Sequence, residues 1–183
     1  LETPFGIFHG PNLTPDRETG TGGWSDSDFS QALRHGRAPD GSPYYPVFPY
    51  PAYAGIGDGD VAAIAAYLRS LPPVHNPVPP HELPWYLRSR WLMLGWNLLF
   101  FDPQPFQPDQ AQDADWNRGA YLVRHLGHCG ECHTPRNLPG ARDDSRELAG
   151  NPEGPDGEKI PNIRQDRKSG IGRWTIDDIV LFL

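Results

Sequence analysis

Cysteine, methionine and positive charge are scarce in this 183-residue chain. It holds two cysteines and one methionine, and its 16 lysines and arginines stand against 23 aspartates and glutamates, a formal net charge of −7. Nucleic-acid binding ordinarily needs a basic surface, so the composition argues against a nucleic-acid partner. Hydrophobic residues make up 37% of the chain and the mean hydropathy is −0.60, which is typical of a globular protein without a membrane span.

Proline and glycine, by contrast, are abundant, with 22 and 20 copies. Both residues interrupt regular structure, so this load predicts short helices separated by long loops. No alternating strand pattern stands out, and we expect an all-α fold. The expected helices are 26–35, 61–71, 85–101 and 115–127. The helix over 85–101 is too short to span a bilayer and carries two arginines, so we expect it to pack across two domains.

Cys129, Cys132 and His133 have the spacing C-x-x-C-H, the attachment signature of c-type haem. The two thiols lie one helical turn apart and can reach both vinyl groups on one porphyrin edge, and the histidine can bind the iron. The alternatives are a zinc half-site, which would need further ligands, and a reducible pair, which would sit in a βαβ unit. We therefore expect haem c at Cys129 and Cys132, with His133 as proximal ligand. Such attachment implies export, so we expect a periplasmic protein whose signal lies outside this sequence.

Residues 11–33 and 161–183 form an internal repeat. The two segments share Pro, Asn, Asp, Arg, two Gly, Trp and Asp at the same places, and each ends in an acidic helix start. We interpret this as a domain duplication. Cys129 lies 32 residues before Pro161. The same spacing places the cysteines of the first copy about 20 residues before Leu1, so a second haem is expected to be attached upstream of this sequence.

Taken together, these segments resemble the diheme and multihaem class I c-type cytochromes. The resemblance covers essentially the whole chain and rests on the repeat, YPVFPYPAY, AAYLRSLPPV, WLMLGWNLLFFDPQPFQPD and WNRGAYLVRHLGHCGECHTPRN. It is closest in character to cytochrome c subunits or partners of bacterial alcohol, aldehyde and gluconate dehydrogenases. It implies tandem cytochrome c domains, over 1–80 and 113–183, joined by a Pro-rich and aromatic linker, 81–112.

The resemblance also implies roles for single residues. Cys129 and Cys132 match the thioether positions and His133 the proximal ligand, while Pro135 and Arg136 match the turn that supports this histidine. Arg136 is also expected to contact the haem. Trp24 and Trp174 match a tryptophan expected near a haem propionate or the porphyrin face. Simple core packing of these two tryptophans is the alternative.

The distal iron ligand is where this chain departs from the family that it resembles. Several relatives read Y-P-A-M-P-Y, in which Met binds iron, but Phe48 occupies that position here and cannot coordinate. We predict that Met93, the one methionine, binds the iron of the first-domain haem. Packing of Met93 as a flexible core residue is the alternative. His9, His75 and His81 are rival ligands, and an iron without a sixth ligand is a further alternative.

The resemblance implies one-electron transfer from a dehydrogenase to an oxidase or cytochrome acceptor, with membrane association through a partner. A diheme peroxidase or thiosulfate dehydrogenase is the alternative. The latter characteristically uses a further cysteine, which this chain lacks.

Overall fold

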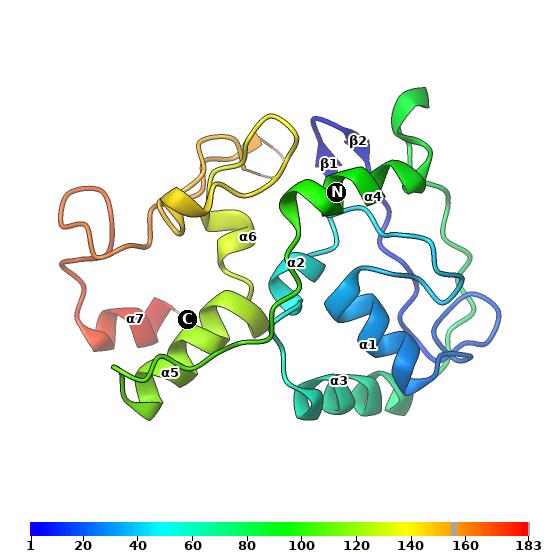
Figure 1. Ribbon diagram of the computed structural model, residues 1–183, viewed down its shortest axis with the longest axis horizontal. Helices are drawn as coiled ribbons and strands as arrows, with labels where there is room; N and C mark the ends of the chain where they lie inside the picture. The colour runs from blue at the N-terminus through cyan, green and yellow to red at the C-terminus, as the bar shows by residue number, and fades with distance from the viewer. Residues whose placement is uncertain (155–156, 183) are drawn as a thin grey trace. The chain divides into compact units, whose positions relative to one another are not determined.

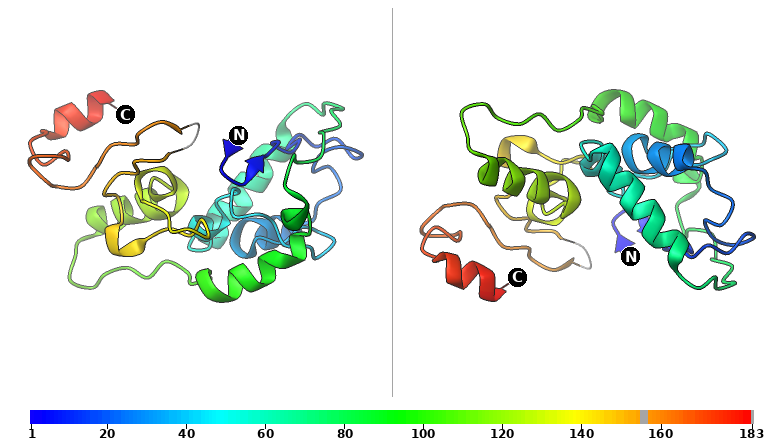
Figure 2. Two further views of the ribbon diagram at one scale, coloured as in Figure 1. Left: turned by 90° about the horizontal axis from the view of Figure 1, so that it is seen from above. Right: turned by 90° about the horizontal axis from the view of Figure 1, so that it is seen from below.

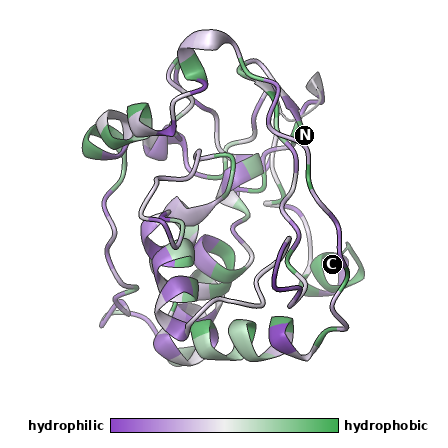
Figure 3. Cartoon of the chain, turned by 90° about the vertical axis from the view of Figure 1, so that its right-hand side faces the viewer, coloured by the Kyte–Doolittle hydropathy of each residue, from purple (hydrophilic) through white to green (hydrophobic). Residues whose placement is uncertain are grey.

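The structure is a computed structural model that describes residues 1–154 and 157–182. The chain divides into two compact units, Leu1–His128 and Cys129–Leu183. Both units consist of short helices joined by long loops (Figure 1), and Figure 3 shows hydrophobic residues both on helices and along the loops. The all-α prediction is therefore confirmed in its main point, while a two-stranded ribbon near the N-terminus was not foreseen. Within the described parts of the chain, no helix combines the length and the apolar character that crossing a bilayer requires.

The first unit holds most of the regular structure. Its elements are β1 (Glu2–Thr3), β2 (Gly6–Ile7), α1 (Asp26–His35), α2 (Tyr50–Tyr53), α3 (Asp58–Ser70), 3-10 turns at Trp85–Leu87 and Arg90–Leu92, α4 (Met93–Phe100), α5 (Ala114–Tyr121) and a π-helical turn at Leu122–Leu126. β1 and β2 are antiparallel and pair Glu2 with Ile7. α1 packs against α2 and α3, as Figure 2 shows from below.

The second unit contains α6 (Gly130–His133), a 3-10 turn at Asp144–Arg146 and α7 (Ile176–Phe182). The helix that we expected to open the second domain, 115–127, belongs to the first compact unit together with the segment 81–112. The domain limits inferred from the repeat stay a prediction.

The observed limits of helix α1, Asp26 and His35, confirm the predicted range 26–35. The Ser25 side chain accepts a hydrogen bond from the Asp28 backbone, and the Asp28 carboxylate accepts one from the Ser25 backbone, which forms a capping box. Gly36 ends the helix with a φ of 60°, in the left-handed region that favours glycine. A Cβ at Gly36 would lie 2.6 Å from the Tyr50 ring, so the same glycine also lets α2 approach.

The prediction of a single helix over 85–101 is wrong, because tertiary contacts interrupt the helix. The Tyr45 hydroxyl donates a 2.6 Å hydrogen bond to the Leu87 carbonyl, which a continuous helix would use internally. Ser89 has an extended backbone, and α4 begins only at Met93. The Tyr50 hydroxyl donates to the Asn97 side-chain oxygen at 2.5 Å. Tyr45, in the loop after α1, and Tyr50, the first residue of α2, therefore hold this segment in the first unit.

The helix expected over 115–127 also changes its form. α5 ends at Tyr121, and the following turn is wider because the Gly127 N–H donates to the Leu122 carbonyl at 2.7 Å. Tyr121 is buried and Leu126 packs against the core, whereas Leu122 is 40% exposed.

Two clusters of buried residues stabilise the first unit. One contains Phe29, Ile56, Val61, Ala65 and Tyr121, contributed by α1, α3, α5 and the connection after α2. The other cluster joins residues far apart in the sequence, and its members are Phe8, Tyr45, Leu83 and Met93.

Gly55 allows the π-helical turn to approach the first cluster. A Cβ at Gly55 would lie 2.1 Å from Cε1 of His125, whose Nδ1 is held 2.7 Å from the Ala52 carbonyl oxygen. We therefore expect Gly55→Ala to lower the free energy of unfolding by about 2–3 kcal/mol through overpacking. Gly119→Ala, in α5 with open space around it, is the control and should raise stability by about 0.5–1 kcal/mol. Urea unfolding followed by circular dichroism measures both, and equal stabilities would contradict this packing.

Candidate functional site

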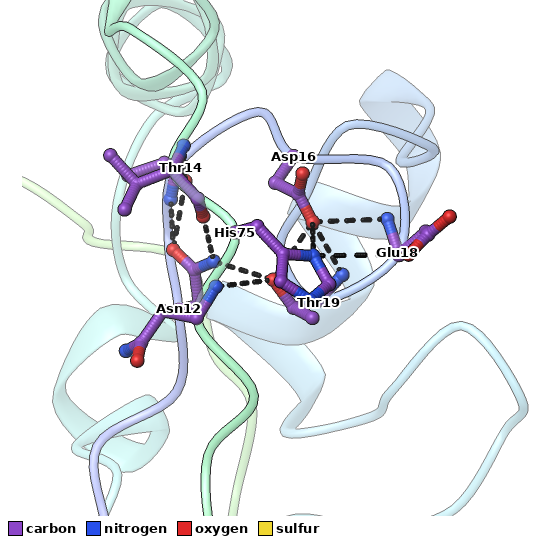
Figure 4. Close-up of polar contacts among 8 residues, drawn as sticks. Asn12, Thr14, Asp16, Glu18, Thr19 and His75 are labelled. Atoms are coloured by element: carbon purple, nitrogen blue, oxygen red, sulfur yellow. Dashed lines mark hydrogen bonds and ion pairs between the residues drawn. The ribbon is translucent and has the colours of Figure 1, made fainter.

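The first copy of the repeat folds into a loop closed by side-chain hydrogen bonds. The Asp16 carboxylate accepts from the Thr19 N–H at 2.7 Å, and the Asn12 side-chain amide donates to the Thr19 hydroxyl at 3.0 Å (Figure 4). The same amide donates to the Val74 carbonyl at 2.8 Å, which ties the loop to the segment after α3. Hydrogen bonds from Thr19 lower the pKa of Asp16 below its ordinary value.

The second copy forms the same loop with the same bonds. The Asp166 carboxylate accepts from the Ser169 N–H at 2.6 Å, and the Asn162 amide donates to the Ser169 hydroxyl at 2.9 Å. Thr175 and Asp178 then form the capping box of α7, as Ser25 and Asp28 do for α1. The repeat seen in the sequence is therefore a repeat of local structure.

Cys129 and Cys132 lie at the short helix α6, Cys129 immediately before it and Cys132 within it. Both are free thiols, with Cys129 half-buried and Cys132 exposed. The helical turn between them is the spacing that thioether bonds to one porphyrin edge require. In the described ranges, no three His, Cys, Asp or Glu side chains are grouped so that they could hold a metal ion.

His133 is oriented by the second copy of the repeat. Its Nδ1 lies 2.8 Å from the Pro161 carbonyl oxygen, so Nδ1 carries a proton and donates to it. The neutral ring then has its free lone pair on Nε2, which is the state that binds a metal ion. A backbone carbonyl on the second ring nitrogen is a common way to orient metal-bound histidines. The free thiols and this histidine therefore fit covalent haem c.

Pro161 was not singled out by our sequence analysis, although a signal was present. Pro and Asn open both copies of the repeat, and the structure gives a reason for that start in the second copy, where the proline carbonyl holds the histidine ring. In the first copy Pro11 occupies the matching position.

Arg136 supports the attachment turn by binding its central residue. Its Nη2 lies 2.6 Å from the carboxylate of Glu131, which stands between the two cysteines, and its Nη1 donates to the Gly140 carbonyl at 2.8 Å. Arg142 adds a second contact to the same carboxylate at 3.3 Å. The Glu131 side chain is only 9% exposed, so these two arginines compensate a nearly buried charge. Direct binding of haem by Arg136 stays a prediction.

Removing the Glu131 carboxylate should loosen this turn. We expect Glu131→Ala to destabilise the second unit by about 1–3 kcal/mol, because the charge-assisted hydrogen bonds of two partly buried arginines are lost. Glu153→Ala, an exposed glutamate of the same unit, is the matched control. Thermal unfolding of both variants checks the prediction, and a Glu131→Ala protein as stable as the control would contradict it.

The two predicted tryptophans have different surroundings. Trp24, in the first unit, is half-buried and its ring lies 5.2 Å from that of Phe29 in the core. Trp174, in the second unit, is 42% exposed and contacts Phe182 edge-on at 5.4 Å. Core packing accounts for much of the environment of Trp24, whereas Trp174 retains free surface. Contact of either tryptophan with haem stays a prediction.

Met93 is 8% exposed and packs with Tyr45 and Val47 in the second cluster. These two residues belong to the loop that also contains Phe48. This placement is what the alternative of core packing predicts, and the role of Met93 as a distal ligand stays a prediction.

Two of the rival histidines have defined partners in the first unit. Nδ1 of His81 accepts a 3.2 Å hydrogen bond from the His9 backbone N–H, which places the proton of the neutral ring on Nε2. Burial, followed by the charges of Arg90 and His9, lowers the pKa of His81 and favours that neutral ring. Nε2 of His9 lies 3.2 Å from the Glu82 carboxylate. To bind iron through Nε2, His81 would have to move its proton from Nε2 to Nδ1 and lose the bond from His9, and His9 would have to leave the Glu82 carboxylate.

The third rival, His75, lies at the repeat loop. Its Nδ1 is 3.7 Å from the Asp16 carboxylate and 3.8 Å from that of Glu18, and its side chain is 59% exposed (Figure 4). The structure therefore places His75 among two carboxylates near solvent, and Met93 in an apolar cluster.

Several known proteins align with the whole length of this chain. It is 45% identical over 185 residues to a diheme cytochrome c-type protein of Cereibacter sphaeroides, and spans 60% of that protein. It is 40% identical over 194 residues to the gluconate 2-dehydrogenase cytochrome c subunit of Pantoea cypripedii, spanning 43% of it. It is 39% identical over 185 residues to the fructose dehydrogenase cytochrome subunit of Gluconobacter japonicus, spanning 38% of it. The chain thus covers less than two thirds of each of these relatives, and no family model matches it.

Proposed function

We propose that this chain, which belongs to a cytochrome c family tied to dehydrogenases, passes single electrons in the periplasm from a dehydrogenase to a downstream acceptor. The observation that carries the proposal is the attachment turn, in which two free thiols precede a histidine whose Nδ1 is held by the Pro161 carbonyl. The relatives support electron transfer as the activity, since several are cytochrome subunits of dehydrogenases.

The residues of the second unit serve to hold and orient. Bound haem supplies the one-electron chemistry. Cys129 and Cys132 would anchor it covalently, and His133 would bind the iron through Nε2. The Pro161 carbonyl fixes the ring orientation and keeps the proton on Nδ1. The ion pairs of Glu131 with Arg136 and Arg142 stabilise the attachment turn. Electron transfer requires no side chain to act as an acid, a base or a nucleophile.

The first unit would serve a second haem, whose attachment residues lie outside this sequence. Pro11 has the place in its loop that Pro161 has in the second copy, and Met93 would supply a ligand to the iron of this haem. A sulfur ligand of this kind raises the reduction potential, which suits an electron carrier.

Carbon monoxide binding to the reduced holoprotein separates relay from catalysis. An electron carrier with both axial positions filled should be reduced and reoxidised reversibly in a spectroelectrochemical titration and should bind carbon monoxide slowly. Rapid, high-affinity binding together with turnover of hydrogen peroxide or thiosulfate would replace the relay with an enzyme.

A further inference from the structure

Apart from Asn97, whose side chain is hydrogen-bonded to Tyr50, helix α4 carries no polar side chain, yet only one of its sides is buried in the first unit. Met93 faces the buried cluster, and Trp96 packs against the same cluster. A helix that is hydrophobic all round is normally covered on every side. The rest of its surface therefore needs a partner.

The uncovered side forms a continuous stripe. Leu94 and Leu98 are four residues apart in α4 and therefore share one face, and Leu99 borders it. Trp91 lies in the 3-10 turn just before α4, three residues ahead of Leu94. The exposed fractions of Trp91, Leu94, Leu98 and Leu99 are 59%, 39%, 86% and 74%. We call these four residues the outer stripe.

The residues around the outer stripe have the character of a membrane-surface segment. Trp85 and Tyr86, in the 3-10 turn ahead of α4, are 81% and 55% exposed. Tryptophan and tyrosine are enriched where the headgroups of a bilayer meet its hydrocarbon core. Residues 83–101 contain Arg88 and Arg90 and no aspartate or glutamate, in a chain of net charge −7.

We propose that the outer stripe inserts into the surface of an anionic lipid bilayer, with Arg88 close to the lipid phosphates. Helix α4 has eight residues and is about 12 Å long, far short of the roughly 30 Å hydrocarbon core, so the contact is interfacial. Three leucines in the stripe bring no hydrogen-bonding group, which suits acyl chains. Protein interfaces carry about one hydrogen bond per 100–200 Å², and leucine is under-represented among their hot spots.

This contact is separate from membrane association through a partner, and it does not depend on the relay function. The test uses the haem-loaded protein and sedimentation with vesicles of phosphatidylcholine containing phosphatidylglycerol, compared with phosphatidylcholine alone. We expect the protein to bind the anionic vesicles more tightly. The variant Leu98→Glu with Leu99→Glu should bind them at least about tenfold more weakly, because two apolar side chains no longer leave water.

Leu138→Glu is the matched control, because Leu138 is 96% exposed and belongs to the second unit. It should bind the vesicles like the unchanged protein, whereas Arg88→Glu should lose the preference for the anionic ones. Absence of vesicle binding overturns the proposal and leaves a protein surface or a second copy as the cover. A dimer that only the double variant abolishes would then identify the second copy. The Soret spectrum of each variant, recorded alongside, separates loss of haem from loss of membrane binding.

Discussion

Replacing both Cys129 and Cys132 with serine is expected to abolish covalent haem attachment in the second unit. A serine hydroxyl does not form the thioether that a thiol forms, and these are the only two cysteines in the sequence. Each single variant should keep one bond. The measurement is haem-linked peroxidase staining after a denaturing gel, combined with the intact mass.

The control for this experiment is Leu138→Ser, a fully exposed change in the same unit. It should retain the haem. A double cysteine variant that still carries haem on the peptide around residue 130 would show that attachment does not use these thiols.

Replacing Met93 with leucine is expected to lower the reduction potential of the first-unit haem by on the order of 0.1 V or more, because the iron loses a sulfur ligand. The reduced protein should also gain rapid carbon monoxide binding. Met93 is buried among apolar side chains, and leucine has a similar volume, so the fold should lose less than about 1.5 kcal/mol. The measurement is a potentiometric titration of the protein carrying both haems.

Leu83→Met makes the reverse exchange in the same cluster, where Leu83 is 6% exposed. It changes the packing to a similar extent and leaves Met93 in place, so both potentials should stay as they are. An unchanged spectrum and potential in Met93→Leu would mean that Met93 only fills the core.

Local signals explain the parts of the fold that the sequence predicted well. The limits of α1 follow from Ser25, Asp28 and Gly36, which act within a few residues of the helix ends. The attachment motif is equally local, since all of its residues lie within Cys129–His133. The repeat also has a local structural counterpart, because the loop bonds of Asp16 and Asp166 depend on residues three positions away.

The parts that were missed depend on contacts between distant residues. The helix over 85–101 breaks because Tyr45 takes the Leu87 carbonyl from 42 positions away. The Pro161 carbonyl reaches His133 across 28 positions. Nor does the helical pattern of 115–127 show that His125 packs on Gly55. Helix propensity and hydrophobic periodicity depend on residues that are close in the sequence, so they do not predict contacts between distant residues.

Peptide mapping of the haem-loaded protein tests the central claim most directly. After proteolysis, mass spectrometry should find haem bonded to the peptide that contains Cys129 and Cys132, and those two thiols should resist alkylation. Two freely alkylated thiols on a haem-free peptide, in protein matured by a host that attaches haem to other c-type cytochromes, would contradict the account.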